Sequence, residues 1–139
     1  MESLSDWLAE HPPPDERFTQ TLAGVAERVR SGEDFRFAVR EFLDEFALRG
    51  RDELRLRALA KEPVTVDQHV DAYLGALAEH LARLHQLEVP AWALSERRML
   101  DHMWFPGVSP GFRPTALRES PAAFRRRGIF IARGALTRV

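Results

Sequence analysis

The chain has 139 residues, of which 45% are hydrophobic and 29% are charged, and its formal net charge is −1 at pH 7. This profile is typical of one soluble globular domain and excludes a largely disordered protein. The sequence contains no cysteine, which excludes disulfides, thiol catalysis and thiolate metal sites. It also contains no apolar run of the roughly 18 residues that span a bilayer and no signal-like start, so we expect a cytoplasmic protein and no membrane partner.

The first predicted elements are helices separated by proline and glycine. Residues 3–11 form one or two amphipathic turns that end at the prolines of residues 12–14. A helix is expected from there to about Arg30, because proline followed by an acid suits the first turn of a helix. Residues 33–50 begin with acids and space their apolar side chains three and four apart, which predicts a helix that stops at Gly50. A shorter helix follows over residues 51–63.

The clearest helical pattern begins at residue 65. Residues 65–68, Thr-Val-Asp-Gln, have the form of a capping box, in which two side chains satisfy free amides at a helix start. Apolar side chains then recur every three or four residues for about six turns. We expect this to be the central helix, ended by the Val-Pro pair at residues 89–90.

The patterns after residue 90 are weaker. Residues 93–105 hold one short helix, and residues 106–114 form a loop rich in proline and glycine. Two short helices are expected after this loop, one over residues 114–119 and one that Ser120 caps and Gly128 closes. The Ile-Phe-Ile run that follows is the only strand-like segment, and we expect either a tail packed on the bundle or an edge offered to another chain. The predicted fold is all-α, a single-domain helical bundle with an irregular C-terminal third.

The sequence shows no catalytic motif. His80 and His85 lie five apart on the central helix and do not share a face, although His102, beside Asp101, could join a helix histidine in space. No nucleophile elbow, phosphate-binding loop or dinucleotide-binding glycine motif is present. We therefore predict no catalytic residue, no metal site and no cofactor. A small enzyme remains an alternative, which a bound metal or a deep pocket at His80 or His102 would favour.

Two features near the C-terminus point to binding. Trp104 and Phe105 precede the proline-glycine loop and do not lie on a helical stripe, so they either plug the end of the bundle or form exposed interface anchors. Within residues 120–128, Phe124 is the only large apolar side chain. It would anchor a short helix and direct several of the arginines at 125–127 outward.

The distribution of charge bears on these arginines. Residues 1–110 carry a net charge of −7, whereas residues 111–139 contain seven arginines and one acid, Glu119. Such a split favours either pairing inside the molecule or a basic surface for an anionic partner. We describe residues 1–139 as one helical domain with an acidic body (1–110) and a basic C-terminal segment (111–139).

Four segments carry a resemblance to known proteins. The stretches FRFAVREFLDEF, VDAYLGALAEHLARLHQLEVPAW, WF and ESPAAFRRRGIF, in this order, resemble a family of small uncharacterised bacterial helical proteins. The C-terminal portion of that family also resembles the tail of some longer regulators with an N-terminal helix-turn-helix domain. The resemblance covers about residues 33–139 and implies an antitoxin or accessory partner of a nucleotidyltransferase-like toxin of the abortive-infection type. The helix-turn-helix portion has no counterpart in this sequence, which counts against direct DNA binding.

We therefore predict a protein-binding module that docks a protein partner through its basic and aromatic C-terminal segment. The residues predicted to form this site are Trp104, Phe105, Phe124, Arg125, Arg126 and Arg127. Arginine and aromatic side chains are the anchors that protein interfaces favour. A DNA-associated transcriptional regulator is the first alternative, and its affinity for DNA would fall steeply with salt. A small enzyme with an unrecognised site is the second.

Overall fold

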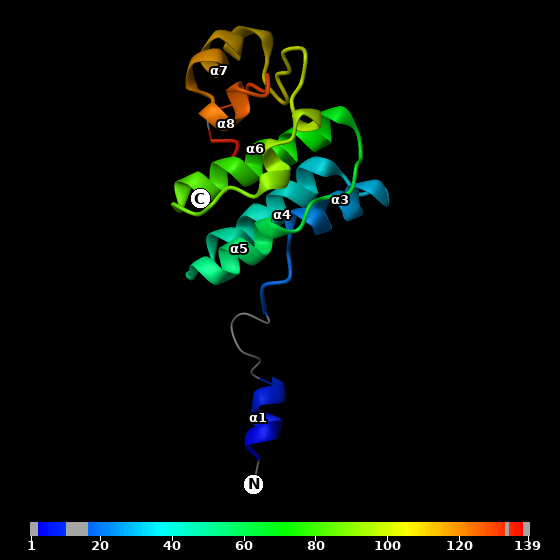
Figure 1. Ribbon diagram of the computed structural model, residues 1–139, viewed down its shortest axis with the longest axis vertical. Coiled ribbons are helices and arrows are strands. Elements are labelled where there is room, and N and C mark those ends of the chain that lie inside the picture. Colours follow the sequence, from blue (N-terminus) through cyan, green and yellow to red (C-terminus); the bar gives the residue numbers. More distant parts are fainter. Residues whose placement is uncertain (1–2, 11–16, 133, 138–139) are drawn as a thin grey trace.

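The computed structural model describes residues 3–10, 17–132 and 134–137. The helices in these ranges are α1 (Leu4–Glu10), α3 (Leu22–Arg30), α4 (Phe35–Ala47), α5 (Asp52–Ala60), α6 (Gln68–Leu84), α7 (Arg113–Glu119) and α8 (Ala122–Arg125), with the 3₁₀ helices η1 (Ala91–Leu94), η2 (Glu96–Arg98) and η3 (Pro110–Phe112) (Figure 1). The described residues form no β-sheet, so the all-α prediction is confirmed. None of these helices combines the length and the apolar character that a membrane crossing requires.

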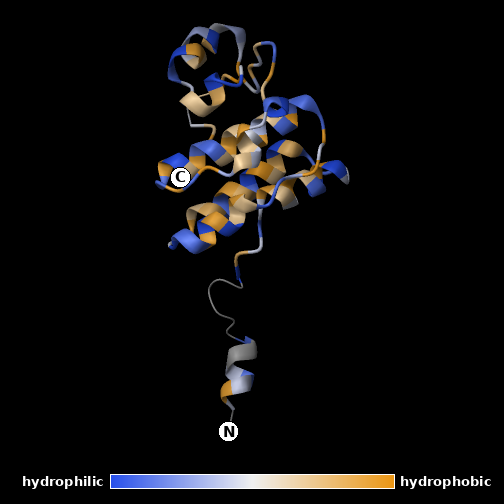
Figure 2. Cartoon of the chain, viewed as in Figure 1, coloured by the Kyte–Doolittle hydropathy of each residue, from blue (hydrophilic) through white to orange (hydrophobic). Residues whose placement is uncertain are grey.

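Helix α6 is the centre of the fold. Every residue from Val70 to Glu79 is buried, because α3 and α5 contact the helix together with η1, η2 and α8. Figure 2 shows hydrophobic residues gathered where helices α3 to α6 face one another. The neighbours approach closely at Gly75, where a Cβ would lie 3.1 Å from the Arg98 Cβ and 3.2 Å from the Ala93 carbonyl oxygen. The strong apolar pattern thus marks the helix around which the rest of the chain packs.

The capping box predicted over residues 65–68 is wrong. The N-cap residue of α6 is Asp67, whose carboxylate accepts the backbone N–H of Val70 at 2.8 Å. One turn further on, Asp71 accepts the backbone N–H of Val66 at 2.9 Å. Aspartate is a better N-cap than threonine, and its negative charge also favours the positive end of the helix. The helix therefore begins two residues later than the predicted box would place it.

Helix α3 also begins later than predicted. The prolines and the acid at residues 12–15 lie outside the described residues, and α3 starts at Leu22. The residues just before it are not helical, because Glu45 of α4 accepts the backbone N–H groups of residues 19 and 20 at 3.3 and 2.7 Å. Thr21 is the N-cap, and its hydroxyl accepts an N–H from the first turn at 2.9 Å. A contact from another helix thus overrides the local signal for a longer helix.

Helices α4 and α5 occupy the predicted segments, and Arg49 holds the turn between them. Its side chain is almost fully buried, and it donates hydrogen bonds to the carbonyls of Leu54 at 2.6 Å and Gln20 at 2.5 Å. Helix α4 ends at Ala47, before Arg49, so the prediction that it stops at Gly50 is wrong.

The C-terminal third is irregular, as predicted. Two 3₁₀ helices, η1 and η2, replace the one short helix expected over residues 93–105. Residues 129–131 are buried and extended, and they form an isolated parallel bridge with Trp104. In this bridge the Trp104 N–H donates to the Gly128 carbonyl and the Phe130 N–H donates to the Trp104 carbonyl, both at 2.8 Å. The tail is thus packed on the bundle, the first of the two predicted alternatives.

Ser120 and Gly128 join this tail to the short helices. The prediction that Ser120 caps α8 is wrong. The Ser120 hydroxyl instead donates to the Ala116 carbonyl at 2.6 Å and accepts the Ile131 N–H at 2.9 Å. The predicted closing role of Gly128 is confirmed. Its φ is +81°, and a Cβ there would lie 2.7 Å from the His102 carbonyl oxygen, so another residue would be strained and would clash.

Candidate functional site

The carboxylate of Glu79 binds two of the three adjacent arginines. Glu79 lies on α6 and has 0% exposed surface. Arg127 donates to its Oε1 at 2.7 Å and Arg126 to its Oε2 at 2.5 Å. Arg83, one turn along α6, donates to the same Oε2 at 2.8 Å. Arg125, by contrast, is exposed and has no ion-pair partner among the described residues.

Two opposing effects set the pKa of the Glu79 carboxyl group. Burial alone would raise this pKa, but hydrogen bonds from Arg127 and Arg83 outweigh it and hold the pKa below its ordinary value. The cluster therefore consists of an ionised, buried Glu79, the buried Arg127 and two half-exposed arginines, Arg83 and Arg126. The ion pairs from Arg126 and Arg127 to Glu79 hold the C-terminal segment against α6.

Arg127 and Phe124 are the predicted site residues that have no exposed surface. Arg127 also donates to the carbonyl of Ala123 at 2.8 Å and to that of Ala93, so it connects α8 with η1. The Phe124 ring packs edge-on against Tyr73 of α6, with 5.1 Å between the ring centroids. Both side chains anchor the segment in the core, and neither presents a surface to a partner.

Trp104 and Phe105 are half-buried. The Trp104 ring stacks on His69 of α6 with 4.5 Å between centroids, and the Phe105 ring stacks on Phe130 with 5.2 Å between centroids. The guanidinium of Arg113 lies 5.1 Å from the centroid of the Phe105 ring. These rings attach the loop to α6 and to the tail, and each retains some accessible surface.

A hydrogen-bonded row of Asp101, His102 and His69 lies beside Trp104. His102 Nδ1 is 2.8 Å from Asp101 Oδ1, and His102 Nε2 is 2.8 Å from His69 Nε2. His69 is thus the helix histidine that His102 joins. When Nδ1 of His102 donates to the aspartate, its Nε2 accepts the proton of His69. No group of three or more ligating side chains in the described residues is arranged to hold a metal ion.

His80 lines a small hollow beside the C-terminal tail. The hollow has a volume of about 180 Å³, below the roughly 300 Å³ at which small-molecule sites begin. Burial lowers the pKa of His80, which favours the neutral imidazole. This hollow is not the deep pocket that the small-enzyme alternative calls for.

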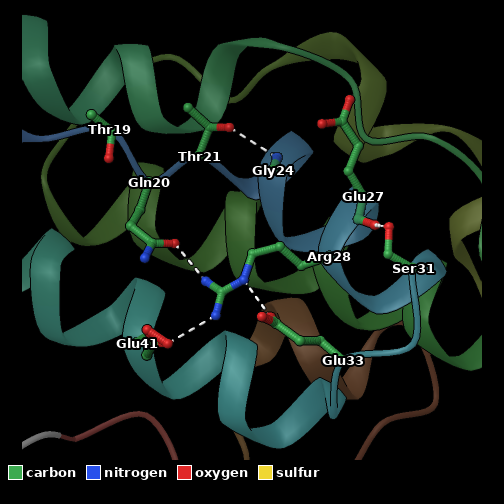
Figure 3. Close-up of a pocket in the computed structure, with 9 residues that line it drawn as sticks. All are labelled: Thr19, Gln20, Thr21, Gly24, Glu27, Arg28, Ser31, Glu33 and Glu41. Carbon is green, nitrogen blue, oxygen red and sulfur yellow. Dashed lines mark hydrogen bonds and ion pairs between the residues drawn. The ribbon is translucent and has the colours of Figure 1, made fainter.

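A larger groove, of about 810 Å³, is lined by residues between Thr19 and Glu41 (Figure 3). Its central side chain, Arg28, donates to Gln20 at 2.9 Å and to Glu41 at 2.8 Å, and it also pairs with Glu33. The donors and acceptors at the centre of this groove therefore satisfy one another. Little hydrogen-bonding capacity remains there for a ligand.

Residues 110–119, which we call the α7 lobe, expose large apolar side chains. Phe112 is 67% exposed and Leu117 is 39% exposed, and Ala116 is the one buried residue of α7. Arg118 lies next to Leu117, is exposed, and has no ion-pair partner in the described part of the chain. Figure 1 shows α7 at the end of the molecule away from α5.

Sequence reasoning missed this lobe. It treated residues 106–114 as a connecting loop and singled out the arginine triplet instead. The available signal was an apolar residue, Phe112, in a segment too short to form an amphipathic stripe. Phenylalanine and arginine side by side on an exposed surface are the residues that interfaces enrich.

The structure thus divides the predicted site residues into three groups. Phe124 and Arg127 are buried anchors, Arg126 is paired and half-exposed, and Trp104, Phe105 and Arg125 retain accessible surface. No family model, curated protein or solved structure matches the chain.

Proposed function

We propose that the chain is a protein-binding module whose α7 lobe contacts a partner protein. The contact surface would consist of Phe112, Arg113, Leu117 and Arg118, bordered by Trp104, Phe105 and Arg125. The observation that carries the proposal is the exposure of Phe112 and Leu117, together with an exposed Arg118 that has no ion-pair partner among the residues that the structure describes. Burying such side chains against a partner removes apolar surface from water, which contributes favourable binding free energy. Phe124, Arg126 and Arg127 would support the surface from below.

The partner that we propose is a bacterial nucleotidyltransferase-like toxin, for which the chain serves as antitoxin or accessory protein in the cytoplasm. The resemblance of residues 33–139 supports this choice of partner. The excess of arginine in the C-terminal segment further predicts that the partner surface is acidic.

The first test is capture of partners by the tagged chain from its native organism, at low and at moderate salt. We expect one stoichiometric protein that survives moderate salt, because apolar contacts resist screening. Recovery of nucleic acid alone, lost at moderate salt, would contradict the proposal and favour the DNA-associated regulator.

The second test measures the affinity of the captured protein for two matched double variants. Phe112→Asp with Leu117→Asp places charges in the α7 lobe, and we expect at least about a 30-fold loss of affinity. The control is Phe37→Asp with Leu56→Asp, since these side chains are 51% and 40% exposed on other helices. Equal affinity of the two variants would show that the α7 lobe is not the contact surface.

A further inference from the structure

A cleft of about 520 Å³ lies between α4 and the loop at residues 104–107. We call it the α4 cleft. One wall is a single face of α4, with Arg36, Val39, Arg40 and Leu43. Phe35, Tyr73 and Trp104 add three aromatic rings to the lining. The volume falls within the roughly 300–1,000 Å³ that small-molecule sites occupy.

The polar side chains of the α4 cleft are all hydrogen-bond donors. They are the guanidinium groups of Arg36 and Arg40, the hydroxyl of Tyr73 and the indole N–H of Trp104, and none has a hydrogen-bond partner among the described residues. No acidic or amide side chain lines the cleft in this part of the chain. The cleft therefore offers donors to a ligand and little that could accept.

The Tyr73 hydroxyl is accessible although its ring is packed. The residue is 8% exposed, and the hydroxyl is not among the buried unpaired polar atoms of the described residues, so it reaches solvent. Burial raises the pKa of Tyr73 to about 12, so the hydroxyl keeps its proton at neutral pH. Tyr73 is thus a fixed donor in the lining of the cleft.

The two arginines of the α4 cleft repel each other. Arg36 and Arg40 lie four residues apart on one face of α4, where like charges destabilise a helix. Two acids of the same helix, Glu41 and Glu45, pair with Arg28 and Arg49. A bound anion between Arg36 and Arg40 would relieve the repulsion between them.

The loop is shaped to approach Arg36. Gly107 has a φ of +69°, and a Cβ at this position would lie 2.9 Å from the Nη2 atom of Arg36. Glycine therefore allows the backbone to lie directly against this guanidinium. The end of the Arg36 side chain therefore lies close to the loop.

From this set of donors we infer that the α4 cleft binds a small organic anion with a flat aromatic body. Arg36 and Arg40 would hold its carboxylate, sulfonate or phosphate group, because guanidinium groups bind such anions through paired hydrogen bonds. The aromatic rings of the lining and the side chains of Val39 and Leu43 would pack on the body. This inference stands apart from the proposed partner contact, with which it shares Trp104 alone.

The experiment compares two fluorescent probes of similar shape, of which one carries a negative charge. Anilinonaphthalene sulfonate is the anion, and phenylnaphthylamine is its neutral counterpart. We expect the wild-type chain to bind the anion about tenfold more tightly than the neutral probe, because two charge-assisted contacts form. Equal affinity for the two probes would overturn the inference.

Matched variants locate the preference. Arg36→Gln with Arg40→Gln should lower the affinity for the anion about tenfold and leave that for the neutral probe unchanged. The control, Arg30→Gln with Arg51→Gln, removes two exposed charges on other elements and should change neither affinity. If the control lowers the affinity for the anion as much as the cleft variant does, the preference reflects net charge and the inference fails.

Tyr73→Phe and the indole signals provide a second readout. The variant removes one donor and should lower the affinity for the anion about threefold, with unchanged affinity for the neutral probe. In a nitrogen-15 spectrum of the wild type, the anion should shift the indole signal of Trp104 and leave those of Trp7 and Trp92 in place. A shift confined to Trp7 or Trp92 would place the probe elsewhere and reject the cleft.

Discussion

Two groups of arginines in this molecule carry the same charge but differ in burial and in their hydrogen-bond partners. Arg49, Arg98 and Arg127 are exposed by 2%, 0% and 0%, and each donates from its terminal nitrogens to two backbone carbonyls, of which at least one belongs to a distant segment. Arg36 and Arg118 are exposed and have no ion-pair partner among the described residues. The first group joins segments of the fold, and the second is available to something outside it. Whether an arginine joins segments or is available to a partner therefore depends on whether an acid or an unpaired backbone carbonyl lies within its reach.

The energetics of the two groups follow from their surroundings. A buried guanidinium has lost its water, so each remaining hydrogen bond is costly to remove. In all three buried arginines the Nε atom has no hydrogen-bond partner in the described structure, which leaves the terminal nitrogens to compensate for desolvation. An exposed arginine retains its water, and its loss changes stability little.

The largest expected effect is at Arg127. Arg127→Met removes the one partner of Glu79 in the described structure that is itself fully buried, and we expect the free energy of unfolding to fall by about 3–5 kcal/mol. Arg125→Met, two residues earlier on an exposed site, should change it by less than about 0.5 kcal/mol. Chemical denaturation of both variants measures the difference. Similar values for the two would show that burial does not distinguish these arginines.

Arg98 and its neighbour Arg97 make a second pair for comparison. Arg98 donates to the carbonyls of Asp71 and Pro63 at 3.0 Å, and its guanidinium lies 4.7 Å from the Trp92 ring centroid. Arg98→Met should cost about 2–3 kcal/mol, whereas Arg97→Met should cost about 1 kcal/mol or less because that side chain is half-exposed. Thermal unfolding of both variants tests this order, and a reversed order would contradict the role given to Arg98.

The smallest effect concerns pH. The pKa of Glu79 is lower in the folded chain than in the unfolded chain, so its ionisation contributes stability above the unfolded value of about 4.3. This contribution is lost as the pH falls through the lower, folded pKa. Glu79→Gln should therefore be less stable than the wild type at pH 7, and the gap should narrow below about pH 4. A gap that is constant from pH 7 to acid would mean that the charge on Glu79 is not what stabilises the segment.

The sequence predicted the elements whose signals are local. The apolar spacing of residues 33–50 and of the segment after residue 65 identified α4 and α6. This was possible because an amphipathic helix repeats its apolar residues every three or four positions within one stretch of sequence. The starts of α3 and α6 were predicted wrongly for a different reason. Glu45 holds the residues before α3 in a non-helical conformation from another helix, and Asp67 and Asp71 together make a better start for α6 than Thr65 does.

The candidate site could not be predicted in the same way. Whether an arginine of the triplet faces a partner depends on Glu79, which lies 48 residues before Arg127 in the chain. From the sequence, pairing inside the molecule and an external partner are both possible, and the structure shows Arg126 and Arg127 in ion pairs with Glu79. The α4 cleft is lined by four segments, namely α4, α6, the loop at residues 104–107 and the tail from Ile131, so no single stretch of sequence indicated it.

The Glu79 cluster also constrains the order in which the chain can become native. During synthesis the carboxylate of Glu79 leaves the ribosome well before Arg126 and Arg127, with Arg83 as its early partner. Closing the core around α6 at that stage would trap an under-compensated charge, which the low-dielectric interior opposes. We therefore expect the bundle to stay open around this helix until residues 126 and 127 have been made. Completion of the fold therefore depends on translation through residue 127.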